Sequence, residues 1–68
     1  MIKTNRTFVK NLNANDSFFV PGIPTRYVVV ARRTMDNRTR VTYRIFGSDE
    51  AVSGEFVKTN LSTVDVVL

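Results

Sequence analysis

The sequence contains no cysteine and no histidine. Without cysteine the chain can form neither disulfide bonds nor thiolate metal sites, and without histidine it lacks the commonest metal ligand. A fold of 68 residues must therefore be held together by packing or by association with another chain. Because so short a chain buries only about 60% of the surface of its unfolded state, it has little room for a deep cleft.

Long apolar runs are also missing. No window approaches the roughly 20 apolar residues of a membrane-spanning helix, and the basic start "MIKTNRT" is not followed by an apolar stretch. Hydrophobic residues at 43% and charged residues at 24% are ordinary values for a folded globular protein. We therefore expect one soluble domain over residues 1–68, located in the cytoplasm.

Catalytic motifs are equally scarce. The serines and threonines have no histidine beside them to act as a base, and no phosphate-binding loop, zinc spacing or EF-hand pattern occurs. The pair Asp49-Glu50 lies in a turn-rich loop, where consecutive side chains point in different directions, so a solvated loop accounts for it better than a Mg²⁺ site. We expect no enzymatic activity, no cofactor and no metal.

What the sequence does contain is a β-strand pattern. Valine, threonine, phenylalanine and tyrosine dominate, and no window keeps apolar residues at helical spacing over three turns. This predicts an all-β fold of five or six short antiparallel strands that curl into a small barrel, with a flat sheet packed in a dimer as the alternative. Leu12 is expected to anchor the asparagine-rich turn before the second strand to the core, and one of Phe18 and Phe19 to face inward. The expected strands are Phe8–Val9, Ser17–Val20, two arms of a long central hairpin within residues 26–46, residues 55–58 and Val64–Leu68.

The central hairpin has a predicted register. Two β-rich runs flank Asp36-Asn37, residues that tolerate the backbone of a two-residue turn. Counting outward from this turn places Arg33 opposite Arg40 and separates the side chains into two faces. The face expected to meet the core carries Val28, Val30, Val41, Tyr43 and Ile45. The other face carries Arg33, Arg38, Arg40 and Arg44 together with Tyr27, Val29 and Phe46, while Arg32 falls at the rim of the core side.

The positive charge of the chain is concentrated in this hairpin. The segment from Arg26 to Arg44 has six arginines and one acid, a net charge of +5, whereas the rest of the chain has four basic and five acidic residues. Concentrated positive charge attracts polyanions. Arginine suits phosphate because its guanidinium can donate hydrogen bonds to two phosphate oxygens at once. Because Arg33 and Arg40 are predicted to lie directly opposite each other, their like charges are expected to lower the stability of the fold.

The first half of the sequence resembles a known family of small barrels. Leu12, then Asp16-Ser17-Phe18, then Pro21-Gly22, then Tyr27 and Val29 resemble the first half of small SH3-like barrels, which include short phage-encoded and bacterial proteins. Where such barrels usually show Gly-Asp before the strand, this chain has Asn15-Asp16. The resemblance covers about residues 9–46 and implies an SH3-like barrel. Members of that group bind nucleic acid, ribosomal or polymerase partners, or proline-rich peptides, so the fold does not choose among functions.

Our functional expectation is a non-enzymatic module, an accessory or regulatory protein of a phage, that binds DNA or RNA through the hairpin. The expected contacts are Arg33, Arg38, Arg40 and Arg44, with Arg26 and Arg32 at the margins and Tyr27 and Phe46 as aromatic platforms. Either aromatic is a core residue instead if the register slips by one. The alternatives are a module that docks on an acidic surface of a host protein, with or without inhibiting it, and a virion or assembly component. A homodimer, or arginines that serve solubility alone, are also left open.

Overall fold

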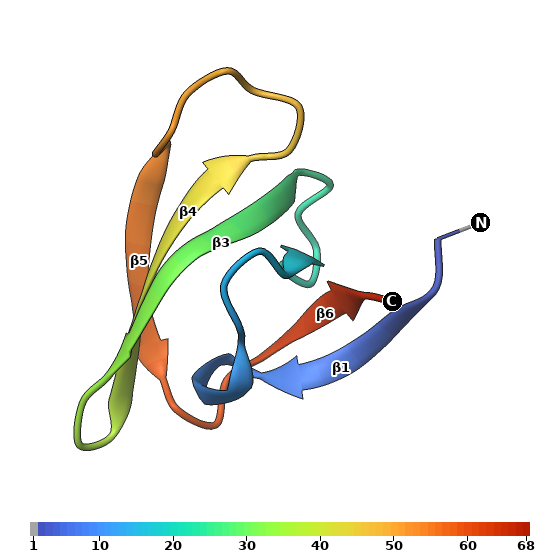
Figure 1. Ribbon diagram of the computed structural model, residues 1–68. Coiled ribbons are helices and arrows are strands. Elements are labelled where there is room, and N and C mark those ends of the chain that lie inside the picture. The colour runs from blue at the N-terminus through green and yellow to red at the C-terminus, as the bar shows by residue number, and fades with distance from the viewer. Residues whose placement is uncertain (1) are drawn as a thin grey trace.

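The computed structural model describes residues 2–68, which form one antiparallel sheet of six strands in the order β1-β6-β2-β3-β4-β5 (Figure 1). The all-β prediction is therefore confirmed. The first strand differs from the prediction, because it ends at Phe8 and Val9 opens a short 3₁₀ turn, η1. The bounds are β1 Thr4–Phe8, η1 Val9–Asn11, β2 Ser17–Phe19, β3 Arg26–Thr34, β4 Arg38–Ile45, β5 Gly54–Thr59 and β6 Thr63–Val67.

The segment between β1 and β2 is anchored as expected by Leu12, whose side chain is fully buried. The turn that follows is closed by two hydrogen bonds, from the Asp16 amide to the Asn13 carbonyl and from the Asn13 amide to the Asp16 carboxylate. Asn15 adopts a φ of 73°, the left-handed region that asparagine tolerates better than most residues. Asparagine thus adopts here a backbone conformation that glycine reaches most easily.

The β3–β4 hairpin turns at Asp36-Asn37, as predicted. The amide of Met35 donates to the carbonyl of Arg38 at 2.7 Å, and near the turn Arg33 pairs with Arg40 and Ala31 with Thr42. Beyond Ala31 the predicted register is wrong, because a β-bulge between Val29 and Ala31 shifts the pairing by one residue. The pairs on the far side of the bulge are Val29 with Tyr43, Val28 with Arg44 and Tyr27 with Ile45.

The shift changes which side chains of β3 reach the core. Val29 is 1% exposed, whereas Val30 is 37% exposed, so the predicted inward and outward roles of these two valines are exchanged. Val28 is buried but does not belong to the core cluster. That cluster combines η1, the turn after it and four strands: Val9, Leu12, Phe18, Val29, Val41 and Val64.

Four aromatic rings pack together, and one of them, Phe18, belongs to this cluster. Phe18 lies 5.5 Å from Tyr27 and 6.1 Å from Phe56, and Tyr43 lies 4.8 Å from Tyr27 and 5.8 Å from Phe56, measured between ring centroids. Of the two adjacent phenylalanines, Phe18 is thus the inward one. The ring of Tyr43 lies over Gly54, where an added Cβ would stand 2.8 Å from the tyrosine oxygen. A glycine in this strand therefore makes room for an aromatic ring.

The sheet is not closed, and β1 and β5 form its two edges. It nevertheless bends strongly, since β1 and β6 cross beneath the β3–β4–β5 part at a wide angle (Figure 1). Residues from both parts meet in the core, as Val64 of β6 and Val41 of β4 show. Among residues 2–68 no helix has the length and hydropathy needed to cross a membrane.

The left-handed backbone at Asn15 provides a test of the turn before β2. We expect Asn15→Ala to lower the free energy of unfolding by about 1 kcal/mol, because alanine lacks the local hydrogen bonding that eases this conformation, whereas Asn15→Gly should be neutral or stabilising. Urea unfolding of both variants measures the difference. Equal stability of the two variants would show that φ at this position does not constrain the turn.

Candidate functional site

The outward side of β4 carries a row of basic side chains. Thr39 and Val41 are fully buried, so the alternate residues Arg38, Arg40 and Arg44 lie on the opposite face. Arg33, paired with Arg40, shares that face. The prediction that these four arginines share one side of the hairpin is therefore confirmed by the register and the burial pattern.

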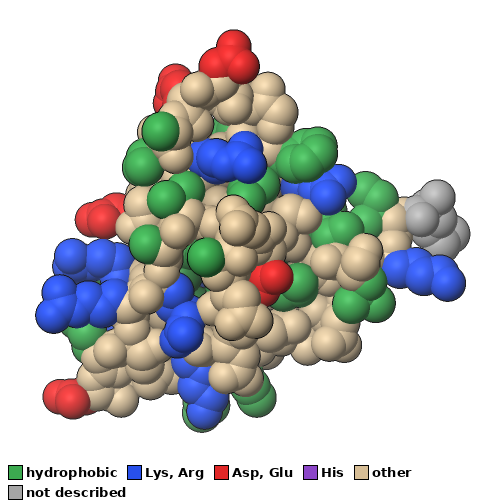
Figure 2. Space-filling model, viewed as in Figure 1, with side chains coloured by type: hydrophobic (Ala, Val, Ile, Leu, Met, Phe, Trp, Pro, Cys, Tyr) green, Lys and Arg blue, Asp and Glu red, His purple; other side chains and the backbone are tan. Residues whose placement is uncertain are grey.

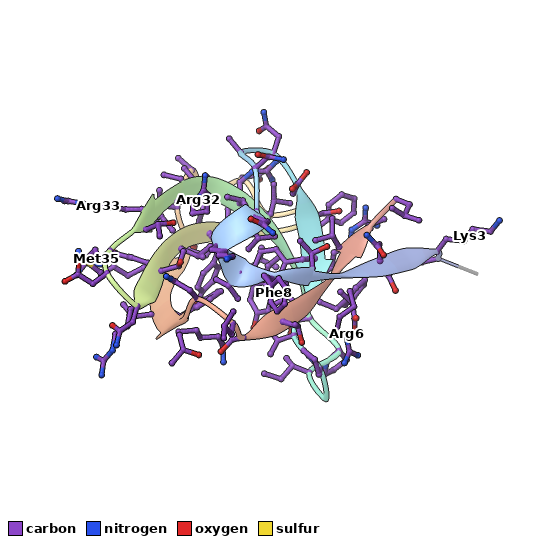
Figure 3. The ribbon with its side chains drawn as sticks, turned by 90° about the horizontal axis from the view of Figure 1, so that it is seen from below. Lys3, Arg6, Phe8, Arg32, Arg33 and Met35 are labelled. Carbon is purple, nitrogen blue, oxygen red and sulfur yellow. The ribbon has the colours of Figure 1, made fainter. Side chains whose placement is uncertain are left out.

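We call this side the arginine face: Arg33, Arg38, Arg40 and Arg44, extended by Arg26 and Phe46 as described below. Arg33, Arg40 and Val57 form a continuous row across β3, β4 and β5. Figure 2 shows Lys and Arg side chains gathered on the left of the view, beside the part of β4 and β5 nearest the hairpin tip. In Figure 3, Arg33 extends from the tip into solvent, at the opposite end of the molecule from Lys3.

The β-bulge changes the membership of this face at its far end. Tyr27, predicted as an aromatic platform, turns inward and packs against the core with Phe18 and Tyr43. Arg26, one residue earlier, therefore points outward beside Ser17, whose strand neighbour Phe18 is buried. The face thus loses one predicted aromatic residue and gains an arginine that had been placed at its margin.

Phe46 remains on the outside, as predicted, with 54% of its surface exposed. The guanidinium carbon of Arg26 lies 4.0 Å from the centroid of the Phe46 ring. Arg26 also donates from Nε and Nη2 to the hydroxyl oxygen of Ser17, at 3.2 Å and 2.9 Å. This guanidinium is therefore fixed by an aromatic ring and a hydroxyl, and no carboxylate contacts it among residues 2–68.

Arg32 lies on the other side of β3, at the rim of the core, as the register predicted. Its Nη1 donates to the carbonyl oxygen of Lys10 at 2.6 Å and to the Thr34 hydroxyl at 2.8 Å. The bond to Lys10 ties β3 to the η1 turn, and the bond to Thr34 lies within β3. Arg32 is thus engaged in the fold and does not belong to the arginine face.

The electrostatics of the arginine face are uncompensated by the chain itself. Within the described residues the one ion pair joins Arg6 to Asp65 at 3.1 Å, on β1 and β6. None of the six arginines between positions 26 and 44 pairs with a carboxylate there. Glu55 shares the outward side of β5, opposite Thr42, without reaching an arginine. The face therefore retains its full positive charge toward solvent.

The tip of the hairpin is held in place by residues that sequence reasoning did not single out. Thr39 is fully buried, and its hydroxyl donates to Asn60 Oδ1 at 2.7 Å. The Asn60 amide donates to the Asn37 carbonyl at 3.0 Å, and its Nδ2 to the Asp36 carbonyl at 3.3 Å. One asparagine in the β5–β6 turn thus binds the hairpin turn through three hydrogen bonds. The signal in the sequence was Thr39, a polar residue at an inward position of β4, whose hydroxyl needs a hydrogen-bond partner when it is buried.

Comparisons with protein-family models, with curated proteins and with solved structures find no match to this chain. The arrangement of side chains is therefore the basis for assigning a function.

Asn60 is expected to contribute strongly to the position of the hairpin tip. Replacing it with alanine leaves the Thr39 hydroxyl buried without its acceptor, at a cost of about 1–3 kcal/mol in unfolding free energy. Adding Thr39→Val to Asn60→Ala should recover part of this loss, because the stranded hydroxyl is then removed. Denaturant unfolding of the single and double variants measures both effects. Strict additivity of the two changes would argue against the coupling.

The pairing of Arg33 with Arg40 makes a second prediction, about charge. Arg40→Glu should raise the free energy of unfolding by up to about 1 kcal/mol at low salt, because it converts a like-charge pair into an opposite-charge pair. Arg33→Glu with Arg40→Glu restores like charges and should lose that gain. Since salt screens exposed charges, the difference should shrink at high ionic strength. A gain that is independent of salt would show that repulsion is not its origin.

Proposed function

We propose that this chain is a non-enzymatic binding module that holds nucleic acid along the arginine face. The observation that supports this function is the one-sided arrangement of arginines for which the described part of the chain provides no carboxylate partner. A nucleic-acid backbone presents a row of phosphates with the complementary charge. The function requires no pocket, because phosphates are bound on an open surface.

The residue type supports the same partner. Every basic residue of the hairpin is arginine, although lysine would serve equally well for solubility. Arginine binds phosphate with two parallel hydrogen bonds and stacks on bases, which lysine does not. Arg38, Arg40 and Arg44 lie along one strand, so that the face follows a line of about 20 Å. A linear anion fits such a row better than a compact one.

The arrangement of the strands is compatible with an SH3-like architecture, which we include in the proposal. Strands β2 to β5 form an uninterrupted meander, and β6 returns to lie beside β2. The additional β1 lies outside β6, and no pairing joins it to β5. An SH3-like module of this size is consistent with a cytoplasmic accessory or regulatory protein of a phage or a bacterium. Architecture alone does not select the ligand.

A second candidate partner is an acidic protein surface. Val57 is 44% exposed and lies in the same row as Arg33 and Arg40, and Met35 at the tip is 39% exposed. Arginines mixed with exposed apolar side chains are also common where two proteins meet. We favour nucleic acid because five arginines extend along the face, whereas the exposed apolar side chains are few and scattered.

The proposal predicts strongly salt-dependent binding. If about three phosphates are neutralised, the logarithm of the association constant for duplex DNA should fall with the logarithm of salt at a slope near −2.7, or roughly 40-fold between about 50 and 200 mM. Arg33→Gln with Arg40→Gln should reduce the magnitude of the slope to about 0.9 by removing two contacts. Fluorescence anisotropy with labelled DNA and RNA measures these slopes.

Lys3→Glu is the matched control, because it lowers the net charge from +4 to +2, as the double arginine variant does, but at the opposite end of the molecule. Its slope should equal that of the original chain. Absent or salt-independent binding of the original chain would contradict the proposal. A stoichiometric protein partner that survives nuclease treatment in a pull-down, without nucleic-acid binding, would favour the acidic protein surface.

A further inference from the structure

The far end of the arginine face carries a feature that phosphate binding alone does not explain. Phe46 is exposed, yet its position is fixed by its backbone. Its amide donates to the Arg26 carbonyl at 3.0 Å, and the Ser48 amide closes the following turn onto the Ile45 carbonyl at 3.0 Å. Gly47 has a φ of +84°, which allows the chain to turn sharply directly after the phenylalanine. The ring is thus presented on a closed turn.

The Arg26 guanidinium beside this ring has unused capacity. Nε and Nη2 donate to the Ser17 hydroxyl oxygen, and the guanidinium carbon lies over the Phe46 ring, 4.0 Å from its centroid. Nη1 has no hydrogen-bond partner among residues 2–68. A planar cation that is already oriented loses little conformational entropy when it binds an anion. Nη1 is therefore a prepared donor for one phosphate oxygen.

We propose that Phe46 and Arg26 form a binding site for one unpaired nucleotide, with the base stacked on the Phe46 ring and a phosphate bound at Arg26 Nη1. This inference rests on the proposed nucleic-acid function and adds a preference for single strands. Bases in a duplex are already stacked on both sides, so an aromatic side chain reaches the face of a base only where the strand is unpaired. The phosphates on either side would continue toward Arg44 and Arg40.

The position of the pair supports this assignment. Phe46 is two residues beyond Arg44 in the same outward phase of β4, so the ring lies in line with the arginines. Phe18, Tyr27, Tyr43 and Phe56 supply the aromatic packing of the core, and Phe46 does not contact that cluster. Single exposed apolar residues are common on protein surfaces. Phe46 differs from these because the guanidinium over its ring is also hydrogen-bonded to Ser17.

Phe8 provides a matched control. It is also an exposed phenylalanine, at 41%, and a cation, Lys10 Nζ, lies 5.8 Å from its ring. It stands at the end of β1, an edge strand separated from β4 by three others in the sheet (Figure 3). Phe8→Leu and Phe46→Leu therefore make the same chemical change on and off the arginine face.

The test compares three labelled probes by fluorescence anisotropy: an oligothymidylate, an abasic strand with the same number of phosphates, and a duplex. The original chain should bind the oligothymidylate roughly tenfold more tightly than the abasic strand, which corresponds to one stacked base. Phe46→Leu should lose that factor, and its affinities for the abasic strand and the duplex should change by less than about twofold. Phe8→Leu should leave all three affinities unchanged. Urea unfolding of both variants checks that the fold is kept.

Three results would overturn the inference, and they differ in what they say about the function. If the original chain binds all three probes with arginine-dependent salt slopes and Phe46→Leu changes none of them, the nucleotide site is wrong and the backbone-binding function stands. If the original chain binds none of the probes at low salt, both are wrong. Loss of binding to every probe in a folded Phe46→Leu variant would also contradict a stacking role.

Discussion

The β-bulge between Val29 and Ala31 is the constraint on which both the core and the arginine face depend. In a strand with strict alternation, Tyr27 and Val29 would share a face with Arg33. The extra residue reverses the phase, so Tyr27 and Val29 enter the core while Arg33 still points outward. The same reversal turns Arg26 outward beside Phe46. One irregularity thus lets Tyr27 and Val29 face the core while Arg26 and Arg33, at either end of the same strand, face outward.

The backbone that carries the arginine face is held in place because the opposite side of the hairpin is packed. Val41 and Thr39, on the inward side of β4, are fully buried. Asn60 accepts a hydrogen bond from Thr39 and donates one to the Asp36 carbonyl in the hairpin turn. Arg32 secures the other arm through the Lys10 carbonyl. A flexible hairpin would move its arginines apart to relieve their repulsion and would have to order them again on binding. The packed side instead holds the backbone of these strands at a fixed spacing, which under the proposed function would reduce the entropic cost of binding a row of anions.

How far the sequence determines these features differs between the two halves of the hairpin. Near the turn, Asp36-Asn37 defines the register and polar residues alternate clearly, so the pairing of Arg33 with Arg40 was predictable. Further along, Val28, Val29 and Val30 are all apolar. The sequence pattern therefore does not show whether Val29 or its two neighbours face the core. Only the need to bury the Tyr27 ring against Phe18 and Tyr43 decides between the phases, and that need arises from tertiary packing. Asn60 could not be assigned for a related reason, since its partners lie more than twenty residues away in sequence.

The uncompensated positive charge lowers the free energy of unfolding of a domain that is too small to be very stable. A chain of this length is expected to be stable by about 3–10 kcal/mol, and each directly opposed pair of like charges costs a few tenths to about 1 kcal/mol. The repulsion is therefore a noticeable fraction of the total, even though a single substitution such as Arg40→Glu would remove it. Under the proposed function, a polyanion bound along the face would replace this repulsion by attraction and release its own counterions. The free energy that the repulsion costs in folding would then be recovered on binding, which would give the crowded arginines a physical role that solubility alone does not require.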